Sequence, residues 1–201
     1  MGPWWAANWT EVLGFGTGLL CVWLASRRNV WNFPIGIANN LVFLWLFTVT
    51  ALYGNAALQV VYLALGVMGW YGWVRAKGAD DDGFVRSATA RGLAVAVLAG
   101  GLGTAGVALL LGQTDSTTEL ADAATTSFSL VAQVLLNRRC WQSWYVWIAV
   151  DVAMVGLAAS KGLWITGALY LIFIGLCLHG LRSWRRELTA APHSEPVEQH
   201  A

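Results

Sequence analysis

The fold is decided by residues 31–52, which read WNFPIGIANNLVFLWLFTVTAL and contain no charged side chain. A helix that crosses about 30 Å of hydrocarbon needs about 20 mostly apolar residues. Six further stretches meet the same test, at approximately 9–26, 56–73, 92–112, 120–136, 141–160 and 162–181. The sequence therefore predicts an all-α, multi-pass protein of the cell (inner or plasma) membrane with seven transmembrane helices.

The overall composition supports a membrane protein. Of the 201 residues, 57% are hydrophobic and 11% are charged, whereas soluble domains carry about a quarter charged residues. The mean hydropathy is +0.57. A soluble domain of this length could not bury so much apolar surface, because small proteins keep much of their surface exposed. The net charge of +1 gives no reason to expect a nucleic-acid partner. The expected surrounding is the lipid bilayer.

Basic residues indicate the orientation of the chain. With the N-terminus outside the cell, the cytoplasmic joints hold eleven of the twelve Lys and Arg residues, and only Lys161 falls outside. Cytoplasmic loops of membrane proteins are enriched in Lys and Arg. The sequence therefore predicts an N-out/C-in topology. The 75–91 joint, with three consecutive aspartates among basic residues, is expected to be a solvated cytoplasmic connector.

The sequence also contains an internal repeat. Arg28 and Trp31 recur as Arg138 and Trp141, 110 positions later, and the Trp that ends the third span recurs 111 positions later at the end of the seventh. One span separates the halves, so both enter the membrane in the same direction. This predicts two parallel three-helix repeats joined by a linker helix, a 3+1+3, SWEET-like plan with a site near the midplane. The alternative is a coincidental likeness between Trp-rich helices.

The repeat divides the chain into four expected parts. They are a first three-helix repeat at 1–74, a cytoplasmic loop with the linker span at 75–119, a second three-helix repeat at 120–184, and a disordered cytoplasmic tail at 185–201.

Polar side chains recur within the spans at helical spacing. The sets are Asn32, Gly36, Asn39 and Asn40; Gln59 and Tyr62; Thr126, Ser129 and Gln133; and Trp144, Trp147 and Asp151. Spacings of three, four and seven place each set on one helix face. Polar groups in a membrane are costly and usually face a bundle interior or an aqueous path. These stripes predict a polar cavity.

Each of these sets also has a structural interpretation. Amides, hydroxyls and glycines hold membrane helices together, and Asp151 could pair with an amide or an indole N–H. Tryptophans at span ends form interfacial belts, which is the role expected for Trp31, Trp73, Trp141 and Trp184. Trp144 and Trp147 lie deeper, on the same stripe as Asp151.

The sequence contains none of the common catalytic motifs. There is no HExxH, no paired acids and no Ser–His set, so no enzyme activity, metal or cofactor is predicted. The three cysteines, Cys21, Cys140 and Cys177, form no CxxC motif and are expected to be small packing residues. Indoles, amides and hydroxyls together suit a small aromatic substrate with several hydroxyls. A non-transporting scaffold and an ion channel are the alternatives from other classes.

Several motifs resemble those of the PnuC-type nicotinamide riboside transporters. In the first half they are NVWNFPIGI at 29–37, Leu52-Tyr53, Leu58-Gln59 and GWYGW at 69–73. In the second half they are Thr125-Thr126, SLVAQ at 129–133, Arg138-Arg139, WxxWIxVDV at 144–152, Lys161-Gly162-Leu163 and Leu169-Tyr170. The likeness covers nearly the whole chain except the 75–91 joint and the tail.

This resemblance implies a transporter for facilitated diffusion of nicotinamide riboside, with a site between the halves. Trp144 and Trp147 would lie against the nicotinamide ring, and Asn and Gln side chains would surround the ribose. The candidate substrate-binding residues are Trp144, Trp147, Asp151, Gln59, Asn32, Asn39, Asn40, Thr126, Gln133, Tyr62 and Tyr170. The resemblance also implies a homotrimer, and uptake would depend on a cytosolic kinase that traps the substrate. Thiamine or riboflavin remains open as the substrate, because relatives in the wider family carry them.

Overall fold

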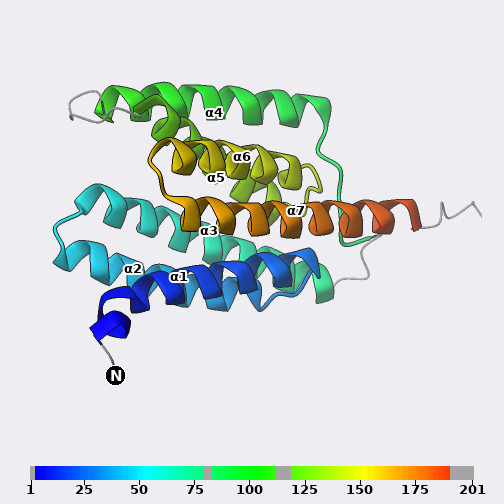
Figure 1. The fold of residues 1–201 in the computed structure, drawn as a ribbon. Helices are drawn as coiled ribbons and strands as arrows, with labels where there is room; N and C mark the ends of the chain where they lie inside the picture. Colours follow the sequence, from blue (N-terminus) through cyan, green and yellow to red (C-terminus); the bar gives the residue numbers. More distant parts are fainter. Residues whose placement is uncertain (1–2, 79–82, 112–118, 191–201) are drawn as a thin grey trace, which may run out of the picture.

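The computed structural model describes residues 3–78, 83–111 and 119–190, and this part of the chain folds into seven α-helices (Figure 1). The helices are α1 (Pro3–Ser26), α2 (Asn32–Val49), α3 (Tyr53–Gly78), α4 (Ala90–Leu111), α5 (Glu119–Asn137), α6 (Ser143–Ser160) and α7 (Trp164–Ala190). They correspond to the seven predicted spans. Five of them, α2, α3, α4, α6 and α7, are long and apolar enough to cross a membrane, and α1 contains a shorter apolar helix, Leu13–Ser26.

The outer surface of the bundle is apolar. Large hydrophobic side chains are exposed on several helices, among them Met68, Leu102, Ile165 and Leu171. Such exposure is unfavourable in water, and it is the surface that hydrocarbon chains cover in a multi-pass membrane protein.

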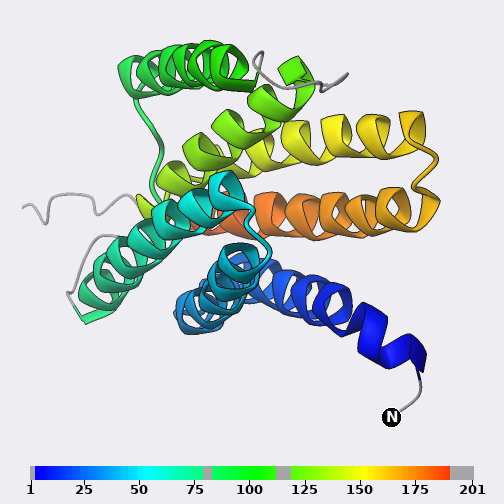
Figure 2. The ribbon, with the colours of Figure 1, turned by 90° about the vertical axis from the view of Figure 1, so that its left-hand side faces the viewer.

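Six of the helices form a closed ring. Each helix packs against the next in the order α1, α2, α3, α5, α6 and α7, and α7 packs against α1. Helix α4 lies outside this ring and, among the described helices, packs against α5 (Figures 1 and 2). In this order α2 and α6 occupy opposite positions. Below, α1–α3 are called the first half and α5–α7 the second half.

The two halves have the same turn geometry at a constant offset of 111 residues. Arg28 and Arg139 both adopt a positive φ, of 57° and 63°. The residue that follows each of them closes the preceding helix with a backbone hydrogen bond. The Asn29 N–H donates to the Leu24 carbonyl and the Cys140 N–H donates to the Leu135 carbonyl, both at 2.9 Å. This is the Schellman helix ending. The 110-residue offset predicted for Arg28 and Trp31 is therefore wrong by one. Their structural counterparts are Arg139 and Gln142, and Trp31 and Gln142 each precede the helix of their half with the same backbone conformation.

Trp73 and Trp184, at the ends of α3 and α7, are the central pair of the aromatic core. Both side chains are 0% exposed, and their ring centroids lie 5.8 Å apart. The interfacial position predicted for these two indoles is wrong. Each indole N–H donates a hydrogen bond within the bundle, so burial leaves no unpaired donor.

The 75–91 joint is not simply a solvated connector, because residues 84–88, here called the strap, pack against the bundle. Val85 is 4% exposed, and the Phe84 ring lies 5.0 Å from Trp73 and 6.4 Å from Trp184, centroid to centroid. The Arg86 N–H donates to the Arg139 carbonyl at 2.9 Å. Apolar burial and backbone pairing thus bind the strap to both halves. The three aspartates of this joint lie outside the described residues.

Helix α7 continues beyond the expected end of the second half. Residues 185–190, predicted to belong to a disordered tail, are helical. Glu187 forms a 2.5 Å ion pair with Arg28 at the end of α1, and Leu188 packs against the hydrophobic core. These contacts explain why the helix extends. Residues 191–201 lie outside the described part of the chain.

Candidate functional site

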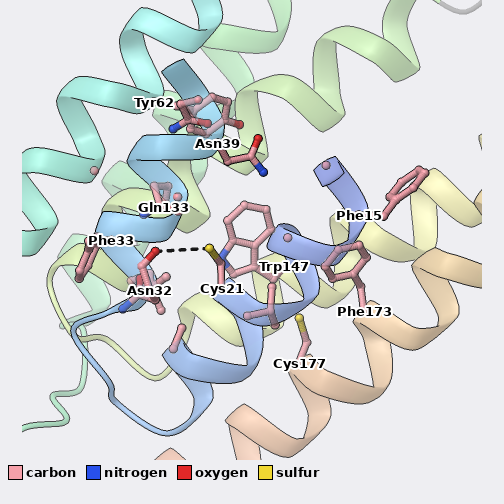
Figure 3. A pocket seen from close by; sticks show the side chains of 18 of the residues that line it. Phe15, Cys21, Asn32, Phe33, Asn39, Tyr62, Gln133, Trp147, Phe173 and Cys177 are labelled. Carbon is pink, nitrogen blue, oxygen red and sulfur yellow. Dashed lines mark hydrogen bonds between the residues drawn. The ribbon is translucent and has the colours of Figure 1, made fainter. Parts of the chain in front are cut away.

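The ring of six helices surrounds a cavity of about 570 Å³. All six ring helices contribute lining residues, and α4 contributes none of the lining residues described. Figure 3 shows that side chains from several helices point into this space, with the Trp147 indole near its centre. A cavity of this size is typical of a small-molecule site.

Most of the residues predicted for the site line this cavity. Nine of the eleven do so: Asn32, Asn39, Asn40, Tyr62, Gln133, Trp144, Trp147, Asp151 and Tyr170. The other two, Gln59 and Thr126, are not among the residues that line this cavity. Gln59 lies about 4.5 Å along the helix axis from Tyr62, and Thr126 about 10 Å from Gln133, at a rise of 1.5 Å per residue. Periodicity places residues on one face of a helix but does not show how deep along the helix they lie.

Several lining residues were missed because they are apolar. They are Phe15, Cys21, Phe33, Phe43, Phe173 and Cys177. In a membrane protein, apolar side chains are expected on every face, so their type gives no sign of a cavity. The repeat could have found some of them, since Phe173 stands 111 residues after Tyr62 and Phe33 stands 111 residues before Trp144.

The cavity lies where the two halves meet. Its lining contains seven pairs of counterparts at the offset of 111: Val22 and Gln133, Ala25 and Leu136, Phe33 and Trp144, Gly36 and Trp147, Asn40 and Asp151, Tyr62 and Phe173, and Gly66 and Cys177. The two members of every pair differ in residue type. A repeated backbone therefore encloses a chemically asymmetric site, which suits a ligand with unlike ends.

Trp144 is wedged into the base of the cavity. Its side chain is 1% exposed, its ring packs edge to face on Trp184 at 5.5 Å, and a Cβ on Gly180 would lie 2.6 Å from it. The same arrangement recurs in the first half, where Phe33 packs edge to face on Trp73 at 5.0 Å. The Trp144 indole N–H has no hydrogen-bond acceptor within the described residues. Buried donors usually have a partner, and the described residues supply none for this one.

Asp151 is the acidic residue of the cavity lining. It is 6% exposed, and the Cys177 thiol donates a long hydrogen bond to its carboxyl group, with 3.6 Å between Sγ and Oδ2. A thiol is a weak donor. A carboxylate in the middle of a membrane helix is unfavourable unless it is paired, so a cationic ligand would stabilise it.

Three amide side chains of the lining are held in fixed hydrogen bonds. Gln133 donates to Asn137 at 3.0 Å, and Asn137 in turn donates to the Leu65 carbonyl of α3 at 2.8 Å. Asn39 donates to the Thr17 hydroxyl of α1, and Asn32 to the Asn29 carbonyl. The structural interpretation therefore holds for part of two stripes, those of α2 and α5. These bonds also fix the orientation of the amides that border the cavity.

The described residues contain no group of three or more His, Cys, Asp or Glu side chains that could hold a metal ion. The chemistry of the lining is that of reversible binding: aromatic faces, anchored amides, one phenol on each of α3 and α7, and one carboxyl group.

Known proteins share this sequence and fold. The model of the nicotinamide mononucleotide transporter family matches residues 8–186. The riboflavin/roseoflavin transporter RibM of Streptomyces davaonensis is 32% identical over 197 residues, covering 96% of this chain and 91% of that protein. The nicotinamide riboside transporter PnuC of Escherichia coli is 29% identical over 203 residues, covering 88% and 85%.

One solved structure has the same arrangement of helices. It is the crystal structure of the vitamin B3 transporter PnuC, which superposes with a TM-score of 0.71 at 22% identity and covers 92% of this chain and 84% of that one. At this level of identity the likeness concerns the fold.

Proposed function

The chain belongs to the nicotinamide mononucleotide transporter family, and we propose from this premise that it carries nicotinamide riboside across the cell membrane by facilitated diffusion. Family members at comparable identity transport that riboside or riboflavin, as their names state. Substrate choice must therefore be argued from the cavity.

The observation that carries the proposal is the combination of Trp147 and Asp151 in one cavity. The nicotinamide ring of the riboside is flat and positively charged. An indole face attracts such a ring by stacking and by cation–π interaction, worth about 0.5–2 kcal/mol. The Asp151 carboxylate, which is 6% exposed, would balance the positive charge of the ring. Riboflavin, whose ring system is neutral, gains nothing from this charge.

The remaining polar groups suit the sugar. Asn40, Gln133 and the two phenols, Tyr62 and Tyr170, offer donors and acceptors around the same cavity. A site that pairs substrate hydroxyls discriminates strongly against analogues that lack them. We assign the riboside's hydroxyls to these groups and its ring to Trp147.

The architecture fits alternating access. The constant offset of 111 and the ring order support two parallel three-helix repeats with α4 as the linker. The positive-inside rule supports an N-out/C-in orientation with seven crossings. A cytosolic kinase that phosphorylates the riboside would keep its free concentration low inside the cell, so that net transport stays inward. A homotrimer, which the family resemblance implies, would be tested by the mass of the purified protein in detergent.

Riboflavin transport is the second candidate, and the 32% identity to RibM favours it. Uptake into proteoliposomes of labelled nicotinamide riboside, thiamine and riboflavin, measured side by side, separates the candidates. The proposal expects saturable uptake of the riboside above empty liposomes. Uptake of riboflavin or thiamine without riboside uptake would contradict it. No uptake of any of the three, together with ion conductance in a planar bilayer, would favour the channel.

A further inference from the structure

We propose that Gly36 is a specificity-determining residue, which sets how broad a ring system the cavity admits. The inference rests on the proposed function, because it concerns the substrate of the same cavity. It follows from the position of Gly36 on the helix opposite that of Trp147.

Gly36 and Trp147 are counterparts across the ring. They are 111 residues apart, on α2 and α6, and these helices occupy opposite positions among the six. Both residues line the cavity. The largest aromatic side chain and a position with no side chain thus lie on opposite helices of the same cavity.

The space at Gly36 is open. A Cβ built there would have a single neighbour within 4 Å, the Cys21 Sγ at 3.7 Å, which is an ordinary van der Waals distance. Other cavity glycines are crowded. A Cβ on Gly14 would lie 2.7 Å from the Phe43 ring, and one on Gly66 would lie 3.1 Å from Ile37. Those glycines are required by helix packing, whereas Gly36 is not.

Packing and local conformation therefore leave Gly36 unexplained. Its backbone lies within α2 and needs no positive φ, and glycine in a helix interior lowers stability relative to alanine. The absence of a side chain at Gly36 does, however, leave free space in the cavity. A flat ring stacked on Trp147 can extend over the bare α2 backbone at Gly36, into a space here called the slot. A side chain at Gly36 would shorten this slot.

The consequence depends on ring size. The single pyridinium ring of nicotinamide riboside needs little of the slot beyond Trp147. The three fused rings of riboflavin need more of it, so they depend on the absence of a side chain at Gly36. With glycine at this position, the cavity admits both ligands, and charge rather than ring breadth favours the riboside.

The test compares Gly36→Ala and Gly36→Val with Gly16→Ala and Gly16→Val in the full-length protein. Gly16 lies on the exposed side of α1, and a Cβ there has no neighbour within 4 Å. Calorimetric titration with nicotinamide riboside and with riboflavin gives the affinities, and melting curves report folding.

We expect wild type to bind both ligands. Gly36→Val should weaken riboflavin binding roughly tenfold or more, as expected for lost fit in a binding pocket, and should weaken riboside binding far less. Gly36→Ala should give a smaller change in the same direction without a lower melting temperature, and the Gly16 variants should match wild type.

Other outcomes would overturn the inference, and they differ from failure of the proposed function. Equal losses for both ligands, no loss for either, or a wild type that binds the riboside but not riboflavin would each show that Gly36 does not set ring breadth. If Gly36→Val fails to fold, the Gly36→Ala affinities decide between these outcomes. A wild type that binds neither ligand contradicts the proposed function itself, and this inference with it.

Discussion

Trp73 and Trp184 are tied to opposite halves of the protein by matching hydrogen bonds. The Trp73 indole N–H donates to the Leu136 carbonyl at the end of α5, and the Trp184 N–H donates to the Ala25 carbonyl at the end of α1, both at 3.2 Å. The two donors are 111 residues apart, and so are the two acceptors. Side-chain hydrogen bonds thus join the two halves next to Phe33 and Trp144, whose rings pack on Trp73 and Trp184.

We predict that these hydrogen bonds contribute to stability beyond ring packing. Trp184→Phe keeps an aromatic ring but removes one of the two donors to the buried Ala25 carbonyl, which also accepts from the Arg28 N–H. The loss should cost about 0.5–1.5 kcal/mol. Trp184→Ala also creates a cavity and should cost about 3–5 kcal/mol. Thermal unfolding in detergent measures both changes. Trp31→Phe is the control, since Trp31 is 63% exposed. Equal melting temperatures for wild type and Trp184→Phe would contradict the role of the hydrogen bond.

The strap should stabilise the aromatic core around Trp73 and Trp184. Phe84 packs against Trp73 and Trp184 and is flanked by the charged groups of Lys77 and Arg139, at 5.7 and 5.5 Å from its ring. Phe84→Ala should lower stability by up to the ~3–5 kcal/mol typical of such truncations. Phe84→Leu, which keeps most of the apolar volume, should lose much less. A melting temperature unchanged in Phe84→Ala would show that the strap is only a connector.

Trp144 and Trp147 should respond differently to truncation. Trp147→Ala should weaken binding of nicotinamide riboside by about 1–3 kcal/mol, as for bases stacked on aromatic side chains, and should leave the melting temperature nearly unchanged. Trp144→Ala should mainly destabilise the fold, because its ring is wedged between Gly180 and Trp184. Calorimetry and melting curves on both variants separate the two roles. Wild-type affinity in Trp147→Ala would remove this residue from the site.

Asp151 should distinguish charged from neutral ligands. Asp151→Asn keeps the shape of the side chain and removes its charge, so binding of the cationic riboside should weaken by about 1.5–3 kcal/mol, the range for hydrogen bonds to charged groups. Binding of neutral riboflavin should change little, and this ligand serves as the internal control. Calorimetric titration of wild type and variant with both ligands makes the comparison. Equal changes for the two ligands would mean that the carboxylate has a structural role.

Much of the fold could be predicted from the sequence because the bilayer imposes simple rules. Span length, short joints and the position of basic residues gave seven helices and their approximate bounds. The repeat was visible in Trp73 and Trp184, although Arg28 and Trp31 were paired with Arg138 and Trp141 instead of Arg139 and Gln142. A one-residue error matters here, because the offset of 111 is what pairs Gly36 with Trp147.

The burial of particular side chains could not be predicted in the same way. The spans are apolar on nearly all sides, so residue type does not separate a lipid-facing position from a buried one. Trp73 and Trp31 both lie near span ends, yet the first is fully buried and the second largely exposed. The strap was missed for a related reason, since two apolar residues among charged ones give no periodic signal. In the same way, the sequence does not show how deep along their helices Gln59 and Thr126 lie relative to the cavity.

The central claim is that this cavity carries nicotinamide riboside by facilitated diffusion, and counterflow tests it most directly. Proteoliposomes containing the wild-type protein are loaded with unlabelled riboside and diluted into a trace of labelled riboside, with equal sodium and pH on both sides. We expect transient accumulation of label, strongly reduced with Trp147→Ala and absent from protein-free liposomes. Label that fails to accumulate with wild type, or that accumulates only when a sodium or proton gradient is imposed, would contradict the account.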